Sequence, residues 1–153
     1  MNQLLPPDQP INAHAPVITR QSITINAPAE RVWKIMEHVN DWKSWNKDIS
    51  AARLSGDFER GHFFIWKAGG FGIRSVLHIA EPFSRIGWSG RALGAYAIHN
   101  WFLSETDGIT TVRVEESMEG WLVKLMKKTF QSKLDAGALR WLQALKVRAE
   151  HGD

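Results

Sequence analysis

The apolar periodicity between Leu122 and Glu150 constrains the fold of this chain more than any other feature. Residues there recur at the three-and-four spacing that places them on one face of a helix. A helix of this length rises about 42 Å at about 1.5 Å per residue, which is enough to cross a small domain. We therefore expect one long helix whose packing face consists of Leu122, Leu125, Met126, Thr129, Phe130, Leu134, Ala138, Trp141, Leu142, Leu145 and Ala149.

A patch of small residues lies within this face, at Ser132 and at 136–138. Glycine inside a helix costs about 1 kcal/mol relative to alanine, so Gly137 has a structural reason to be there. One interpretation is a close contact between the helix and a sheet. The other is a helix that covers a sheet without filling the space beneath it.

Short runs of alternating apolar and polar residues precede the helix, and turn residues separate them. We expect a first strand over 18–27, a helix that begins near Pro28, and a short helix that carries Trp42 and Trp45. Six further strands are expected at 49–54, 62–67, 71–80, 85–91, 96–104 and 109–120. This order predicts an α+β fold, in which an antiparallel sheet of about seven strands is covered on one face.

The chain is expected to form a single domain over 18–150, preceded by a mobile tail over 1–17. Its 153 residues are enough for one sizeable core. Residues 1–16 carry four of the six prolines and show little periodicity, which is typical of a tail. The lack of cysteine excludes disulfides, thiolate metal sites and a cysteine nucleophile, and it favours a reducing compartment such as the cytoplasm.

The formal net charge of +3 is modest, and much of the positive charge follows the polar side of the C-terminal helix. A solvated helix face explains it better than a nucleic-acid or membrane-binding patch, because no nucleic-acid motif or continuous basic run is present. The apolar runs are too short to span a bilayer, and no two histidines share a metal-ligand spacing. We expect a monomer or homodimer without nucleic acid, metal, cofactor or stable membrane insertion.

Eight tryptophans and seven phenylalanines predict a core, or a pocket, built from large flat side chains. Charged residues of the middle strands fall on one face, so the opposite face is expected to look toward the long helix. That inner face consists of His62, Phe64 and Trp66, then Ile73, Ser75, Leu77 and Ile79, then Ile86, Trp88 and Gly90.

The last two strands carry the most specific constellation in the sequence. With a four-residue loop over 105–108, His99 is expected opposite Val114, and Glu116 lies diagonally from His99 at about 7–8 Å between backbones. Trp101 shares this face, which is apolar apart from one imidazole and one carboxylate. Three interpretations of the two groups are open. They could be a pair whose hydrogen bonds are satisfied within the core, a polar anchor for a ligand in an apolar cavity, or a general acid/base pair.

Several segments together resemble the SRPBCC or START-like superfamily, specifically small bacterial proteins described as polyketide cyclase/dehydrase-like. The similarity runs from Ile23 to Glu150, and its segments are 27–33, 42–46, 64–66, 88–90, 99–101, 115–117 and Gly120. The resemblance implies a helix-grip fold, in which a curved antiparallel sheet grips the long C-terminal helix over a hydrophobic cavity. Members of the superfamily include lipid and sterol carriers, hormone and polyketide binders, and aromatase/cyclases.

The leading functional prediction is binding, and with it transport or sequestration, of a hydrophobic small molecule such as a lipid, an isoprenoid or a polyketide-like aromatic. The first alternative is a polyketide cyclase/aromatase-type enzyme in which His99 and Glu116 transfer protons. The second is an interaction or regulatory domain whose cavity is filled by tryptophans. The residues expected to line the site are Phe64, Trp66, Ser75, Leu77, Trp88, His99, Trp101, Val114, Glu116, Leu125, Thr129 and Leu134.

Overall fold

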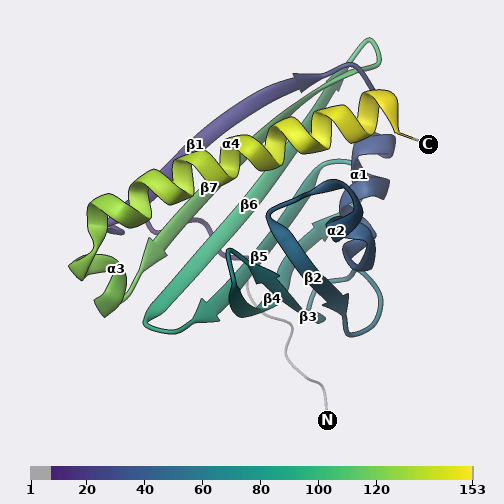
Figure 1. Cartoon of the computed structure of the whole chain (residues 1–153). Coiled ribbons are helices and arrows are strands. Elements are labelled where there is room, and N and C mark those ends of the chain that lie inside the picture. The colour runs from purple at the N-terminus through teal and green to yellow at the C-terminus, as the bar shows by residue number, and fades with distance from the viewer. Residues whose placement is uncertain (1–7, 153) are drawn as a thin grey trace.

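Seven antiparallel strands form one sheet in the order β1-β7-β6-β5-β4-β3-β2. The computed structural model describes residues 8–152, and Figure 1 shows the sheet curving around the long helix α4. The strands are β1 (Val17–Ile25), β2 (Ile49–Leu54), β3 (Phe63–Ala68), β4 (Phe71–Glu81), β5 (Arg85–Ala92), β6 (Ala95–Thr106) and β7 (Ile109–Glu119). The helices are α1 (Ala29–Glu37), the 3-10 turn η1 (Val39–Asp41), α2 (Trp42–Trp45), α3 (Trp121–Leu125) and α4 (Lys127–His151). The predicted α+β helix-grip fold is confirmed.

The first and last strands lie side by side, because β1 pairs with β7 along its whole length. Helix α4 crosses the inner face of the sheet above them, and α1 and α2 lie near the end at which α4 finishes (Figure 1). Helix α1 begins after Pro28 and buries Val32, Trp33 and Met36. This arrangement directs the inner faces of the strands toward α4.

The single helix expected over 122–150 is in fact two helices. Met126 separates α3 from α4 and has a non-helical conformation, with φ −116° and ψ 41°. Helix α3 buries Val123, whereas the buried residues of α4 begin only at Ala138. The break lets the two segments pack in different directions. The face expected to pack along the whole helix therefore packs mainly through its C-terminal part, at Ala138, Trp141, Leu142, Leu145 and Ala149.

The turn between β6 and β7 is shorter than expected. Asp107 and Gly108 both have positive φ, of 53° and 77°, and Thr106 pairs directly with Ile109. Such a two-residue turn matches the twist of antiparallel strands. The expected four-residue loop was wrong by two residues, which shifts the register without changing the face.

A β-bulge changes the faces of the second half of β4. Leu77 pairs with Trp88 but Ile79 pairs with Gly87, so Ile79 lies on the outer face, contrary to the prediction. The extra residue is His78, which is buried. Gly87 leaves room for it, because a side chain there would clash with His78.

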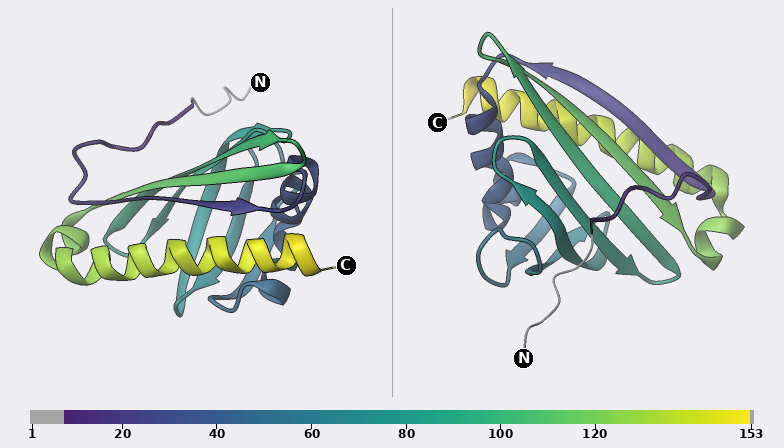
Figure 2. Two further views of the ribbon diagram at one scale, coloured as in Figure 1. Left: turned by 90° about the horizontal axis from the view of Figure 1, so that it is seen from above. Right: turned by 180° about the vertical axis from the view of Figure 1, so that it is seen from behind.

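Residues 8–16 lie across the outer face of the sheet (Figure 2, right). The backbone oxygen of Gln9 accepts a hydrogen bond from Asn100 Nδ2 at 2.8 Å, and its side chain accepts one from the Tyr96 hydroxyl at 2.7 Å. Asn12 N donates to Ser117 Oγ at 3.0 Å. Residues 8–16, which make these contacts, belong to the segment 1–17 that was expected to form a mobile tail. Residues 1–7 of that tail lie outside the described residues.

No helix within residues 8–152 combines the length and the apolar character needed to cross a membrane.

Candidate functional site

Six aromatic side chains fill the space between the sheet and the C-terminal half of α4. Each is at most 8% exposed, and the ring centroids of contacting pairs are 5.3 to 6.4 Å apart. Many pairs meet edge to face, a geometry that adds to the stability gained by burial. This aromatic cluster consists of Trp42 from α2, Phe64 and Trp66 from β3, Trp88 from β5, Trp101 from β6 and Trp141 from α4.

His99 and Glu116 form a polar pair at the edge of the aromatic cluster. They lie directly opposite each other on β6 and β7, and His99 Nδ1 is 3.3 Å from Glu116 Oε2. Their side chains are only 5% and 12% exposed. The imidazole stacks on Trp101 with a centroid separation of 5.2 Å and approaches Trp88 at 4.6 Å. The shorter turn has thus brought the two groups closer than the diagonal placement expected from the sequence.

Burial changes the proton affinity of both members of the pair. It lowers the pKa of His99 from 6.5 to about 3, because the apolar surroundings disfavour the imidazolium. It raises the pKa of Glu116 from 4.5 to about 8, because the same surroundings disfavour the carboxylate. At neutral pH the pair therefore consists of a neutral imidazole and a mostly protonated carboxyl group, which together can accept a proton or donate one.

Three ring nitrogens at this place have no hydrogen-bond partner among the described residues. They are Nε2 of His99 and the indole nitrogens of Trp101 and Trp141. The three rings contact one another, with centroid separations of 5.2, 5.5 and 5.7 Å. Buried polar groups are nearly always paired, so three unpaired nitrogens on contacting rings are unusual. These three nitrogens could form hydrogen bonds to one further polar group in the otherwise apolar interior.

The structure brings together nine of the twelve side chains expected in the site: Phe64, Trp66, Ser75, Leu77, Trp88, His99, Trp101, Val114 and Glu116. Ser75 is satisfied by Trp66, whose indole nitrogen donates to its hydroxyl at 3.0 Å. The expected helical roof is displaced. Leu125 is 75% exposed, Thr129 is also exposed, and Leu134 is half-buried.

The residues that cover the inner face in place of that roof are Trp141 and Trp42. Trp141 contacts Trp66, Trp88, Trp101 and His99. Its place on the periodic face of the helix could have identified it, because it lies seven residues, or about two turns, after Leu134. Trp42 had no comparable signal, since α2 is too short to show a periodicity.

Two hollows are open at the surface, and both lie beside α4 near its C-terminal end. One has a volume of about 540 Å³ and is lined by residues of α1 and by Arg148. The other, of about 530 Å³, lies between 45–48 and α4. Neither is lined by a residue of the expected site. Within residues 8–152, no group of three or more histidine, aspartate or glutamate side chains is placed to hold a metal ion.

Comparison with known families places this site in context. The model of the family described as polyketide cyclase / dehydrase and lipid transport matches residues 16–149. The chain belongs to this family. It therefore has the SRPBCC/START-like fold that the sequence resembled. No curated protein sequence matches the chain.

Solved structures of similar fold share little sequence with this family member. A hypothetical protein from Helicobacter pylori aligns with a TM-score of 0.82 at 16% identity, over 98% of this chain and 99% of its own. The Zhui aromatase/cyclase from Streptomyces sp. R1128 aligns with a TM-score of 0.76 at 12% identity, over 86% and 92%. A START superfamily protein from Mycobacterium smegmatis aligns with a TM-score of 0.68 at 12% identity, over 86% and 96%. At these identities the likeness concerns the fold alone.

Proposed function

We propose that the protein binds a hydrophobic small molecule with one polar group, and that His99 and Glu116 anchor that group. The observation that carries the proposal is the set of three unpaired ring nitrogens, on His99, Trp101 and Trp141, within an apolar cluster. An apolar site with a few convergent polar groups suits a ligand such as a fatty acid, an isoprenoid alcohol or a polyketide-like aromatic. The family description, which includes lipid transport, supports the same ligand class.

The ligand would take the place of the Trp141 ring. Trp141 is the one member of the aromatic cluster that α4 carries, and none of the residues of α4 before Ala138 is buried. A small movement of α4 would therefore withdraw this ring at less cost than a movement of β3, β5 or β6, which are hydrogen-bonded to a neighbouring strand on both sides. The ligand's polar group would then meet two of the three unpaired nitrogens, His99 Nε2 and the indole nitrogen of Trp101, while Glu116 holds the imidazole from its Nδ1 side.

A second candidate is a polyketide cyclase/aromatase-type enzyme. The observation that favours it is the protonation state of the pair, because a carboxyl group with a pKa of about 8 still carries its proton at neutral pH. Glu116 could protonate a substrate carbonyl, and the lowered pKa of His99 keeps the neighbouring imidazole neutral. The aromatase/cyclase with a similar fold supports this candidate through its fold alone.

Native mass spectrometry of the freshly purified protein is the first test. An extra mass that disappears on denaturation would identify the class of a bound ligand. Titration with oleic acid, farnesol and 1-naphthol then follows binding through tryptophan fluorescence, because a ligand among these rings must change their emission. Saturable binding of at least one probe is expected.

Three variants separate the candidates. If the protein is a binding protein, His99→Gln and Glu116→Gln should each lower the affinity for the probe that binds most tightly about tenfold, which corresponds to the loss of one hydrogen bond. The matched control is His78→Gln, which changes the other buried histidine and should bind like the wild type. In a cyclase the two inner variants would lose turnover of a poly-β-ketone substrate and keep its binding.

A third outcome would overturn the proposal. If the protein carries no extra mass and binds no probe, and if both inner variants lower only its stability, the aromatic cluster is a filled core. The chain would then be an interaction or regulatory domain. A location in the cytoplasm and a monomeric or homodimeric state without nucleic acid remain predictions.

A further inference from the structure

Helix α3 meets the turn between β5 and β6 at one end of the molecule (Figure 1). Exposed apolar side chains gather there. Leu93 is 82% exposed, Leu125 75%, Trp121 67% and Met126 44%. They are four of the ten large hydrophobic side chains that are exposed among the described residues. The other six are distributed over other parts of the fold, where single exposed apolar residues are ordinary.

Contacts between α3 and the turn hold these residues together. Leu122 N donates a hydrogen bond to Gly94 O at 3.3 Å, and a Cβ on Gly94 would meet the Trp121 ring at 3.0 Å. Gly94, the residue after Leu93, therefore lies against Trp121. Leu125 follows Trp121 by one helical turn, so both project from the same side of α3.

The same end of the molecule is strongly basic. From Trp121 to Leu134 the sequence contains Lys124, Lys127, Lys128 and Lys133 and no acidic residue, and the turn adds none over 91–95. The first three of these lysines are exposed and none of them forms an ion pair with another described residue. We call Leu93, Trp121, Leu125 and Met126, together with Lys124, Lys127 and Lys128, the α3 tip.

We propose that the α3 tip docks on an anionic lipid bilayer. Tryptophan and leucine side chains enter the boundary between head groups and acyl chains, and lysines beside them are attracted by anionic lipid. The α3 tip presents both elements on one small, projecting surface. This docking is peripheral, and it does not depend on what the interior binds.

Charge argues against the two other occupants of such a surface. Two copies meeting through their α3 tips would bring six lysines together, and Glu119, the nearest acidic residue in the sequence, already accepts a hydrogen bond from Asn12 Nδ2. A nucleic acid would be attracted by the lysines but would leave the apolar side chains in water, because phosphates need basic and polar partners. A bilayer with anionic head groups offers both a negative charge for the lysines and an apolar environment for the apolar side chains.

Vesicle cosedimentation of the full chain tests the proposal. We expect binding to vesicles of phosphatidylcholine mixed with phosphatidylglycerol, little binding to phosphatidylcholine alone, and weaker binding as salt is added. The triple variant Lys124→Gln/Lys127→Gln/Lys128→Gln should lower the partition coefficient about a hundredfold. Trp121→Ser should lower it about tenfold.

Two control variants carry matched changes elsewhere. Lys43→Gln/Lys47→Gln/Lys67→Gln removes the same net charge from other exposed positions, and Phe71→Ser removes an apolar side chain that is 62% exposed. Both should bind close to the wild-type level. His99→Gln should also bind vesicles normally, which separates a failure of docking from a failure of the interior site.

Three results would overturn docking. The first is no binding to the vesicles that contain phosphatidylglycerol. The second is equal loss in the two triple variants, which would mean that only net charge matters. The third is that sedimentation velocity shows a dimer that Trp121→Ser dissociates, which would make the α3 tip a contact between two copies.

Discussion

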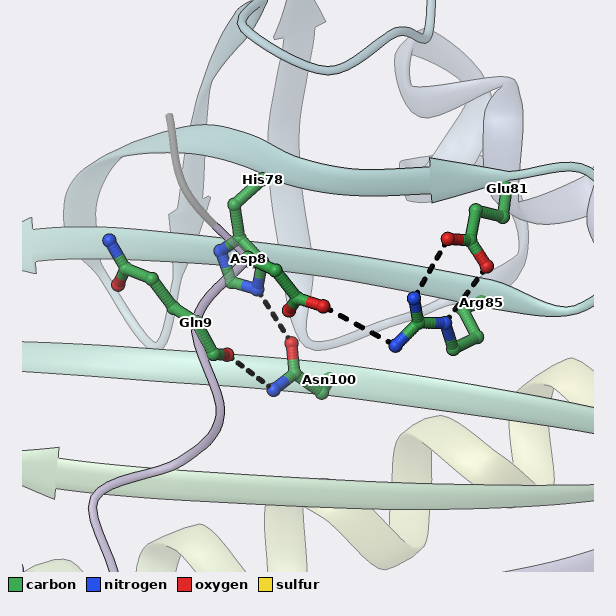
Figure 3. A network of polar contacts seen from close by, with 6 residues as sticks. All are labelled: Asp8, Gln9, His78, Glu81, Arg85 and Asn100. Atoms are coloured by element: carbon green, nitrogen blue, oxygen red, sulfur yellow. Dashed lines mark hydrogen bonds and ion pairs between the residues drawn. The ribbon is translucent and has the colours of Figure 1, made fainter. Parts of the chain in front are cut away.

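Two buried histidines lie on opposite faces of the same sheet, and their surroundings differ in kind. On the inner face, His99 meets the carboxyl group of Glu116 and lies against tryptophan rings. On the outer face, His78 Nε2 lies 2.7 Å from the amide oxygen of Asn100, and the same amide donates to the backbone of Gln9. Figure 3 shows this outer network, together with Asp8, Arg85 and Glu81.

Burial alone does not distinguish these histidines, because it lowers the pKa of both. Their neighbours do distinguish them. A carboxyl group can exchange a proton with an imidazole or with a ligand, whereas a carboxamide can only orient the ring. The surroundings of His99 therefore suit ligand binding or proton transfer, and those of His78 suit the attachment of residues 8–16.

The largest effect is expected from Trp88→Ala on the inner side. Trp88 contacts His99 and most of the aromatic cluster, so its removal should lower the free energy of unfolding by about 3–5 kcal/mol. The control is Phe102→Ala on the outer face, where Arg113 stacks on a half-buried ring at 4.1 Å. Urea unfolding followed by circular dichroism should show a clearly smaller loss for Phe102→Ala. Equal losses would mean that the inner cluster is not the main core.

Asn100→Ala should break the outer network. It leaves His78 Nε2 buried without a partner and removes the donor to Gln9, at a cost of about 1–3 kcal/mol. Hydrogen exchange should speed up at the Asn12 amide, which is bonded to Ser117, while probe binding stays unchanged. Unchanged exchange at Asn12 would show that residues 8–16 are held independently of Asn100.

Glu116→Gln should change the pH dependence of stability. The unfolded chain loses this proton near pH 4.5 and the folded protein keeps it to about pH 8, so the wild type loses stability as the pH rises through this window. Glutamine has no proton to lose. As the pH rises through this window, the free energy of unfolding of the variant should therefore increase relative to that of the wild type. The expected change is about 1 kcal/mol or more, the equivalent of one pKa unit.

Urea unfolding at about pH 5 and about pH 8.5 measures this shift. The contrasting variant is His78→Gln. Burial lowers the pKa of His78, so the wild type loses stability as the pH falls below 6.5. The stability of His78→Gln relative to the wild type should therefore increase only as the pH is lowered below that value. A difference between Glu116→Gln and the wild type that stays constant with pH would contradict the raised pKa of Glu116.

The smallest effect is expected from Arg85→Gln. Arg85 bonds Glu81 at 2.7 Å and Asp8 at 3.4 Å, but all three side chains are partly exposed. Ion pairs of this kind contribute about 0–1 kcal/mol. Exchange at the Asn12 amide should stay near the wild-type rate. If Arg85→Gln increased this exchange rate as much as Asn100→Ala, the ion pairs of Arg85 would be what holds residues 8–16 on the sheet.

The inner face could be predicted from the sequence because side chains alternate between the two faces of a strand, so an error of two residues in the strand register leaves each residue on the same face. The loop before Ile109 was predicted two residues too long, yet His99 and Glu116 still shared a face. Alternation does not survive a bulge, and nothing in the local sequence marks the one at His78. Ile79 was therefore placed on the wrong face.

Other features depended on packing between distant segments. The periodic face of 122–150 contains no signal for the break at Met126, which arises because α3 packs on the turn at Gly94 and α4 packs on the sheet. The attachment of residues 8–16 uses backbone and amide groups that any polar segment offers. Only the folded outer face determines which of them find partners.

Strand β1 can find its place in the sheet only after β7 has been synthesised. Val17 pairs with Met118, and α4, which packs on β1, follows β7 in the sequence. Closing so long a loop is slow compared with forming the hairpins between β2 and β7. On the ribosome, those hairpins can form first, while β1 emerges early and remains unpaired. Completion of the sheet therefore waits for the synthesis of β7, and β1 is the segment that needs protection until then.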